Sequence, residues 1–214
     1  MFGFMNSGKS KPVKKGLKII IVGCGKVGTT LVEQLSKEGH DIIIIDKNAK
    51  KVQEIAEILG DTEKAAELAK EEKAKTEAAK KYLLDSETGL FVSGPDRQIN
   101  YANQVWMVLA GVVDTEEDAK ILEKVAEMKP EKGMVSPYMN HHYVEALLLC
   151  GKKEQALDYM KYYWGGMISH GADTFWELYN PENPAESPYG SSIVNSYCHA
   201  WSCTPTYLLR KYFA

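Results

Sequence analysis

The fold of the first part of the chain is decided by the segment Leu17-Lys-Ile-Ile-Ile-Val-Gly-Cys-Gly-Lys-Val-Gly28. A second run, Asp41-Ile-Ile-Ile-Ile-Asp46, follows it about a dozen residues later. Each run is short and rich in β-branched residues, and each is bounded by glycine or a charged residue. This pattern is typical of parallel strands that are buried on both faces. We therefore expect two neighbouring parallel strands.

The segment after each strand carries apolar residues at helical spacing. Gly39 ends the first segment, while Asn48 can cap the second and Gly60 ends it. The apolar stripes consist of Val27, Leu31 and Leu35 in the first segment and of Val52, Ile55, Ala56 and Leu59 in the second. Strands and helices together predict a short Rossmann-like β-α-β-α unit over residues 17–60.

The glycines between the first strand and the first helix suit a phosphate-binding turn. Gly23 would make the tight turn, Gly25 would let the backbone approach a pyrophosphate, and Gly28 would let the helix pack close to the sheet. The start of a helix offers free N–H groups and a positive dipole end to phosphate groups. Asp46, at the end of the second strand, could accept hydrogen bonds from a ribose diol.

Over residues 18–58 the sequence resembles the RCK (KTN) domains of TrkA-type potassium-transport regulators, which bind NAD or a related adenine nucleotide. Residues 19–28 and 45–48 carry the resemblance. It implies NAD as a cofactor, held by Gly23, Gly25, Lys26, Val27, Gly28 and Asp46. Such domains continue with a third strand and further βα units, whereas this sequence leaves the strand pattern after two.

Two segments have a composition rich in charged residues, residues 61–84 and residues 1–16. Residues 61–84 consist almost wholly of Ala, Glu and Lys, which predicts a charged, solvated helical spacer. Residues 1–16 contain several lysines and no strand or helix pattern, so we expect a disordered basic leader.

Residues 85–214 show helical stripes separated by glycine and proline. The pattern predicts about three antiparallel helical hairpins in an all-α domain. The stripes are Ile99, Ala102, Trp106, Leu109, Ala110 and Val113; then Ala119, Leu122, Val125 and Ala126; then Tyr143, Ala146, Leu147 and Cys150; and Ala156, Leu157, Met160, Tyr163 and Trp164, stopped by Gly165 and Gly166.

Aromatic and acidic residues gather near the end of this domain. Trp176 precedes Glu177, and His199 and Trp201 follow a short distance later. A carboxylate beside aromatic side chains suits a sugar pocket, since aromatic rings stack on sugar C–H surfaces and polar groups bond the hydroxyls. The alternative is that both tryptophans fill a helical core. Spacing alone does not decide between these two interpretations.

Residues 88–213 resemble the C-terminal half of the six-hairpin (α/α)6 catalytic domain of bacterial α-L-rhamnosidases, glycoside hydrolase family 78. The resemblance implies a partial toroid of helical hairpins with a carbohydrate ligand. It makes Glu177 the general base and places Trp176 and His199 on the sugar-binding surface, where we also expect Trp201, Tyr138 and His142. It is carried by residues 89–95, 104–111, 136–138, 163–166, 171–177, 187–190 and 195–205.

The general acid of such enzymes comes from an earlier part of the barrel, which has no counterpart before Thr88. Because inverting hydrolysis needs two carboxylates roughly 6.5–9.5 Å apart, we expect sugar binding with little or no hydrolysis. One alternative is a nucleotide-responsive RCK-type regulatory module of potassium transport. Another is a fusion of two truncated pieces in which neither part functions.

Composition restricts the remaining possibilities. A net charge of -3 provides no basic field for nucleic acid. The four scattered cysteines and the short apolar runs favour a cytoplasmic protein with no membrane span. We expect no metal site, because the adjacent His141 and His142 would point apart on a helix and no carboxylate or cysteine spacing matches them. Uncovered inner helix faces of a half-toroid predict self-association.

Overall fold

The computed structural model describes residues 16–23, 25–46, 48–131 and 133–214, without the side chains of Lys26 and Ala49. The chain forms two compact units with the boundary between Ala78 and Ala79. Each unit has its own hydrophobic core and is described by itself below. Nearly all of the predicted basic leader lies outside the described residues.

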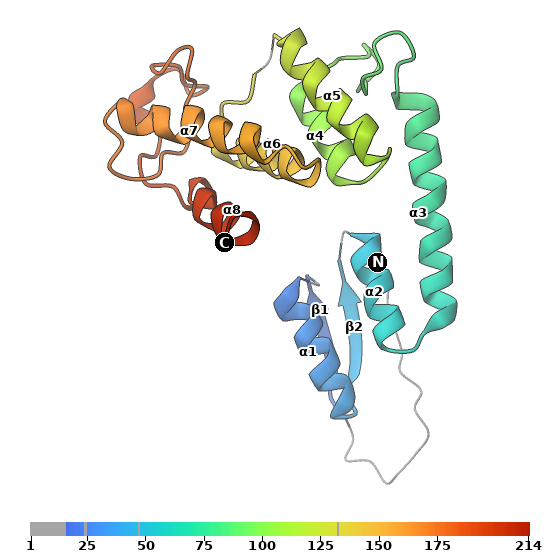
Figure 1. The fold of residues 1–214 in the computed structure, drawn as a ribbon. Coiled ribbons are helices and arrows are strands. Elements are labelled where there is room, and N and C mark those ends of the chain that lie inside the picture. The colour runs from blue at the N-terminus through green and yellow to red at the C-terminus, as the bar shows by residue number, and fades with distance from the viewer. Residues whose placement is uncertain (1–15, 24, 47, 132) are drawn as a thin grey trace. The chain divides into compact units, whose positions relative to one another are not determined.

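The first unit is the predicted β-α-β-α arrangement (Figure 1). The two strands are parallel, and their register runs from Lys18 opposite Asp41 to Val22 opposite Ile45. Asn48 caps the second helix as predicted, through bonds from the N–H groups of Lys50 and Lys51 to its side chain. The elements are β1 (Lys18–Val22), α1 (Lys26–Lys37), β2 (Asp41–Ile45) and α2 (Ala49–Ile58).

The buried face of α1 differs from the predicted stripe. Val27 and Leu31 are 75% and 46% exposed, while Val32 is fully buried. The prediction is wrong for Val27 and Leu31 but holds for Leu35, which packs against the core. Close packing of Gly28 against the turn at Gly23 makes Gly28 and Val32 face the sheet. The core of this unit consists of Ile21, Val32, Ile42, Ile44, Val52, Ile55, Ala56, Ala65 and Leu68.

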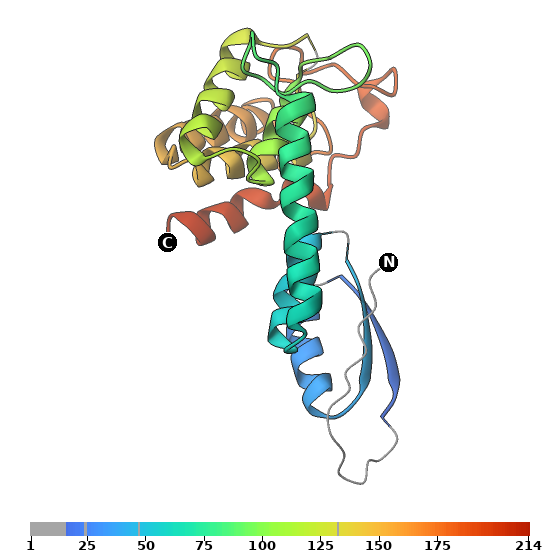
Figure 2. The ribbon, with the colours of Figure 1, turned by 90° about the vertical axis from the view of Figure 1, so that its right-hand side faces the viewer.

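The charged segment forms α3 (Thr62–Leu83), a continuous helix (Figure 2). It is helical as predicted, yet not merely a solvated spacer. Leu68 is fully buried in the core of the first unit, and Leu83 packs against the core of the second. Apolar side chains near the two ends of one helix therefore belong to different cores.

The second unit is helical, as predicted, but its described residues form two helical hairpins and a further helix and not three hairpins, because loops and 3-10 turns occupy the chain between α7 and α8. Helices α4 and α5 form one antiparallel hairpin and α6 and α7 another, with α4 and α8 both packed against α6 (Figure 1). The helices are α4 (Tyr101–Leu109), α5 (Thr115–Met128), α6 (Pro137–Leu149), α7 (Lys153–Ser169) and α8 (Thr204–Tyr212), with 3-10 turns η1 (Ser192–Val194) and η2 (Ala200–Ser202).

The buried residues of α4 are Gln104, Val105 and Val108, and not the predicted stripe, whose Trp106 is 43% exposed. Gln104 decides this rotation. Its side-chain amide donates to the carbonyl of Phe91 and accepts from the N–H of the same residue, both at 2.8 Å. The polar side chain of Gln104 thus joins α4 to the turns that precede it. The spacing of apolar residues in the sequence does not predict such a contact.

The prediction that Gly165 and Gly166 stop the preceding helix is wrong, because α7 continues to Ser169. The reason is tertiary packing of Tyr179 against the helix. A Cβ atom on Gly166 would lie 2.6 Å from the hydroxyl oxygen of Tyr179. The glycine therefore provides room for an aromatic ring and does not end the helix.

Candidate functional sites

Glu177 is held in place through both carboxylate oxygens. The hydroxyl of Tyr189 donates to Oε1 at 2.7 Å, and the N–H of Ser196 donates to Oε2 at 2.8 Å. The N–H of Glu177 donates in turn to the carbonyl of Ser196 at 2.8 Å. Its own carbonyl accepts the indole N–H of Trp201 at 2.9 Å. Four hydrogen bonds thus fix the predicted base on a segment without regular secondary structure.

These bonds also fix the charge of Glu177. The N–H of Ser196, then the hydroxyl of Tyr189 and the nearby His199 lower the pKa of its carboxyl group below the usual value. A lowered pKa keeps the carboxylate ionised at neutral pH. An ionised carboxylate can accept a proton from water, so Glu177 is chemically able to act as a base.

Aromatic side chains form a continuous series that ends beside Glu177. We call the residues Trp106, His142, Tyr138, Trp201 and His199 the aromatic row. The successive ring centroids lie 4.6, 4.7, 6.1 and 4.4 Å apart, and the last two rings are stacked. Tyr138 is 45% exposed and Trp106 43%, so both residues are partly open to solvent. Four of the predicted sugar-binding residues are thus brought together.

The surroundings of Trp176 and Trp106 differ from those that the sequence suggests. Trp176 packs against the core, and its ring is edge-on to Tyr179 and Tyr197. Trp106 joins the aromatic row through His142, although its spacing placed it in the core stripe of α4. The one sequence signal for Trp106 is its place in residues 104–111, one of the segments that resemble rhamnosidases.

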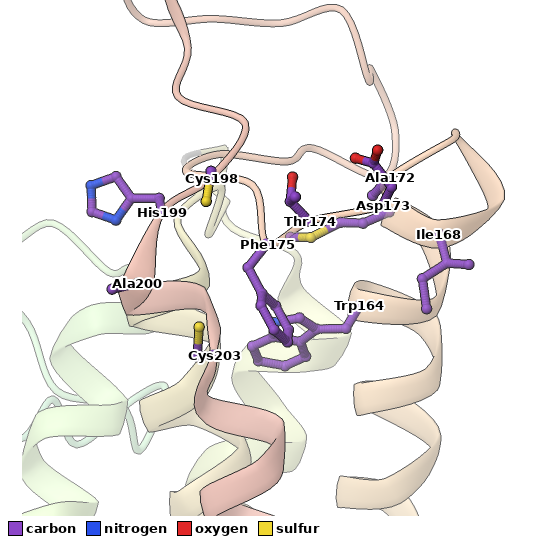
Figure 3. A pocket seen from close by; sticks show the side chains of 11 residues that line it. Trp164, Ile168, Ala172, Asp173, Thr174, Phe175, Cys198, His199, Ala200 and Cys203 are labelled. Atoms are coloured by element: carbon purple, nitrogen blue, oxygen red, sulfur yellow. The ribbon is translucent and has the colours of Figure 1, made fainter.

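A separate pocket of about 650 Å³ lies where the end of α7 meets η2 (Figure 3). Figure 3 shows the rings of Trp164 and Phe175 close together, and the imidazole of His199 pointing away from them. The pocket and the aromatic row share His199 alone. The pocket is lined by Trp164, Met167, Ile168, Ala172, Asp173, Thr174, Phe175, Cys198, His199, Ala200 and Cys203.

The glycines predicted to form the phosphate-binding turn lie between the end of β1 and the start of α1. Gly23 has a φ of 93°, which favours glycine, and its N–H donates to the carbonyl of Ile45 at 2.9 Å. A Cβ atom on Gly28 would lie 2.0 Å from the carbonyl oxygen of Gly23. Gly25 caps α1 without a side-chain bond, so the helix start presents backbone N–H groups. Cys24 and the side chain of Lys26 lie outside the described residues.

The predicted ribose-binding acid lies at the end of β2. Its Oδ1 accepts the N–H of Asn48 at 2.8 Å. The N–H of Gly23 donates to the carbonyl of Ile45, the residue before Asp46. Asp46 and the glycine turn therefore lie at the same end of the two strands. Exposed Val27 follows the turn on α1. The predicted nucleotide-site residues with described side chains therefore lie at one end of the two-stranded sheet.

The family model of the TrkA-N domain matches residues 19–128. The chain belongs to the TrkA-N domain family. The TrkA-N domain is a nucleotide-binding fold, in agreement with the glycine turn. The matched residues include both strands and extend through α3, α4 and α5.

Curated relatives of a short stretch of the chain are potassium uptake proteins. The TrkA homolog of Pyrococcus abyssi is 46% identical over 39 residues, which are 18% of this chain and 17% of that protein. Trk system potassium uptake protein TrkA of Vibrio alginolyticus is 51% identical over 39 residues, or 18% of this chain and 8% of that protein. The similarity therefore spans less than a fifth of either relative.

Solved structures resemble most of the chain. A rhamnosidase from Klebsiella oxytoca with rhamnose bound is 40% identical with a TM-score of 0.74, over 78% of this chain and 32% of that one. The family GH78 rhamnosidase of Bacillus sp. GL1 is 27% identical with a TM-score of 0.64, over 86% of this chain and 18% of that one. The chain thus spans about a third or less of these enzymes. The predicted rhamnosidase-like all-α fold is confirmed.

The comparisons confirm that a TrkA-type part is joined to a glycosidase-like part. We refer to the first unit as the TrkA-N unit and to the second unit as the rhamnosidase-like unit. Among the helices that the structure describes, none is both long and apolar enough to cross a bilayer.

Proposed function

We propose that the rhamnosidase-like unit binds a rhamnose-type sugar on the aromatic row, with Glu177 directed at the anomeric region. One observation carries the proposal: Glu177 is held by hydrogen bonds, and its carbonyl accepts the indole N–H of Trp201, a member of the aromatic row. The likeness to a rhamnosidase that contains rhamnose supports the choice of sugar.

The chemistry of these residues suits recognition of a deoxy sugar. The faces of Trp106 and Tyr138 can cover C–H and methyl groups, while His199 can bond hydroxyls. Glu177 would accept a proton from the attacking water in an inverting reaction. The other carboxylates of the late loops have different surroundings: Glu182 accepts the hydroxyl of Tyr162, and Asp173 lines the separate pocket. We therefore propose binding with little or no turnover.

Calorimetric titration of the full chain with L-rhamnose tests this proposal. We expect Trp201→Ala to weaken binding about tenfold, which corresponds to about 1.4 kcal/mol. Tyr82→Ala is the matched control, since Tyr82 is 64% exposed in the same unit and lies outside the aromatic row. Any hydrolysis of an aryl rhamnoside should vanish in Glu177→Gln. Absence of binding at millimolar rhamnose, or equal affinity of the Trp201 variant, would refute the proposal.

A second function is favoured by the contact between Gly28 and Gly23. We propose that the TrkA-N unit binds NAD or a related adenine nucleotide at the start of α1, with Asp46 on the ribose. Only glycine fits at position 28, and the closeness it permits leaves the helix start open to a pyrophosphate.

Titration with NAD, NADH and ATP tests the second function. A ligand at one hundred times its Kd stabilises the folded unit by about 2.7 kcal/mol, so a raised melting temperature should accompany binding. Asp46→Asn should weaken NAD binding, whereas Asp41→Asn, at the opposite end of β2, should not. Unchanged melting and no heat of binding with all three nucleotides would refute it.

A further inference from the structure

One turn of α6 brings together three side chains that can bind a metal ion. The ligand atoms of His141, His142 and Glu145 all lie within 4.8 Å of one another. The spacing of residues in the sequence did not predict a carboxylate beside the two histidines. In the structure, Nε2 of His141 lies 3.7 Å from Oε2 of Glu145, because residues four apart share one face of a helix.

The 3.7 Å separation is too long for a hydrogen bond and close to that of two ligands of one ion. Two atoms bonded to a tetrahedral Zn²⁺ at about 2.0–2.1 Å stand about 3.4 Å apart. Adjacent side chains on a helix diverge, but the imidazole centroids of His141 and His142 are only 4.8 Å apart. The ligand atoms of all three side chains therefore lie near enough for one ion to draw them together.

Glu145 is oriented by groups on the far side of its carboxylate. The ammonium of Lys211 donates to Oε1 at 2.8 Å, and the hydroxyl of Tyr212 donates to the same oxygen at 3.1 Å. Oε2 is thereby left directed toward His141. Hydrogen bonds of this kind orient carboxylates in metal sites.

His141 is nearly buried and has a ring nitrogen without a hydrogen-bond partner among the described residues. Its side chain is 12% exposed, and Nδ1 has no hydrogen-bond partner in the part of the chain that the structure describes. An imidazole without a hydrogen-bond partner on a ring nitrogen can offer the lone pair of that nitrogen to a metal ion.

We propose that His141, His142 and Glu145 form a binding site for Zn²⁺ or a related divalent ion of the first transition series. Two imidazole nitrogens and one carboxylate oxygen suit Zn²⁺, Co²⁺, Ni²⁺ or Cu²⁺, and not Mg²⁺ or Ca²⁺, which prefer oxygen ligands. Three protein ligands leave a fourth position for water. The site shares His142 with the aromatic row, because the ring of His142 also contacts Trp106 and Tyr138.

Titration of the full chain with Co²⁺ and Zn²⁺ tests the proposal. Serine replaces Cys24, Cys198 and Cys203 in the background protein, which leaves the half-buried Cys150 as its one thiol and reduces competition for the ion. We expect one ion per chain and the visible absorption of tetrahedral Co²⁺ without thiolate charge-transfer bands. Glu145→Gln and His141→Asn should each weaken Zn²⁺ binding about tenfold or more.

The control is His170→Asn, which removes an exposed imidazole of the same unit and should leave the affinity unchanged. Circular dichroism without metal checks that each variant is folded. Glu145→Gln keeps an oxygen for the bond from Tyr212, and His141→Asn decides the matter if Glu145→Gln does not fold. Absence of tetrahedral Co²⁺ absorption would overturn the proposal, as would unchanged Zn²⁺ affinity in a folded variant.

Discussion

Replacement of Asp118 by asparagine should stabilise the rhamnosidase-like unit, and only when the solution is neutral or alkaline. Asp118 lies in the first turn of α5, is 6% exposed, and its Oδ1 has no hydrogen-bond partner among the residues that the structure describes. Burial, followed by the nearby carboxylates of Asp114 and Glu117, raises its pKa from 3.8 to about 7. The folded protein therefore holds a proton on Asp118 that the unfolded chain loses near pH 4.

The sign and size of the effect follow from this difference. Because the folded pKa is the higher one, the stability is fully present below pH 4 and is lost as the pH rises through 7. About three pH units correspond to about 4 kcal/mol if the charge were wholly shielded from water. Asp114 and Glu117 are exposed and screened by solvent, so we expect about half of this, ~2 kcal/mol, above pH 8.

Urea unfolding followed by tryptophan fluorescence measures this effect in one unit. All four tryptophans belong to the rhamnosidase-like unit, so the signal reports its unfolding. Asp118→Asn should unfold at higher urea concentration than the parent protein at pH 8 and at nearly the same concentration at pH 4. Asp158→Asn is the control, since the Asp158 side chain is 76% exposed. A variant no more stable than the parent at pH 8, or equally stabilised at both pH values, would refute the reasoning.

Two further changes test the packing of the same unit. Gly166→Ala should destabilise it by about 1–3 kcal/mol in thermal unfolding, because the new methyl group displaces the ring of Tyr179; an unchanged melting temperature would contradict the contact. Gln104→Leu should cost about 1–3 kcal/mol, since the buried N–H and carbonyl of Phe91 lose their partners, and faster exchange of the Phe91 amide hydrogen should accompany the loss. Protection of that amide equal to the parent's would show that Gln104 is not what holds the turn.

Elements that depend on local backbone chemistry could be predicted from the sequence. The strands β1 and β2 follow from short β-branched runs, and the turn at Gly23 requires a positive φ that glycine adopts without strain. Rotation of the helices about their axes could not be predicted so well. On α1 the close approach of Gly28 decides which face is buried, and on α4 the bonds of Gln104 decide it. Both depend on atoms of other elements.

The sequence by itself determined that a parallel β-α-β unit with a glycine turn is followed by helical hairpins. The spacing of apolar residues, the helix caps and the glycines each depend on residues that lie close together in the chain. Only the tertiary structure decided which side chains share a surface. The aromatic row joins α4, α6 and η2, and Glu145 meets Lys211 across α6 and α8. Such neighbours are set by how helices pack, and packing depends on contacts between residues that lie far apart in the chain.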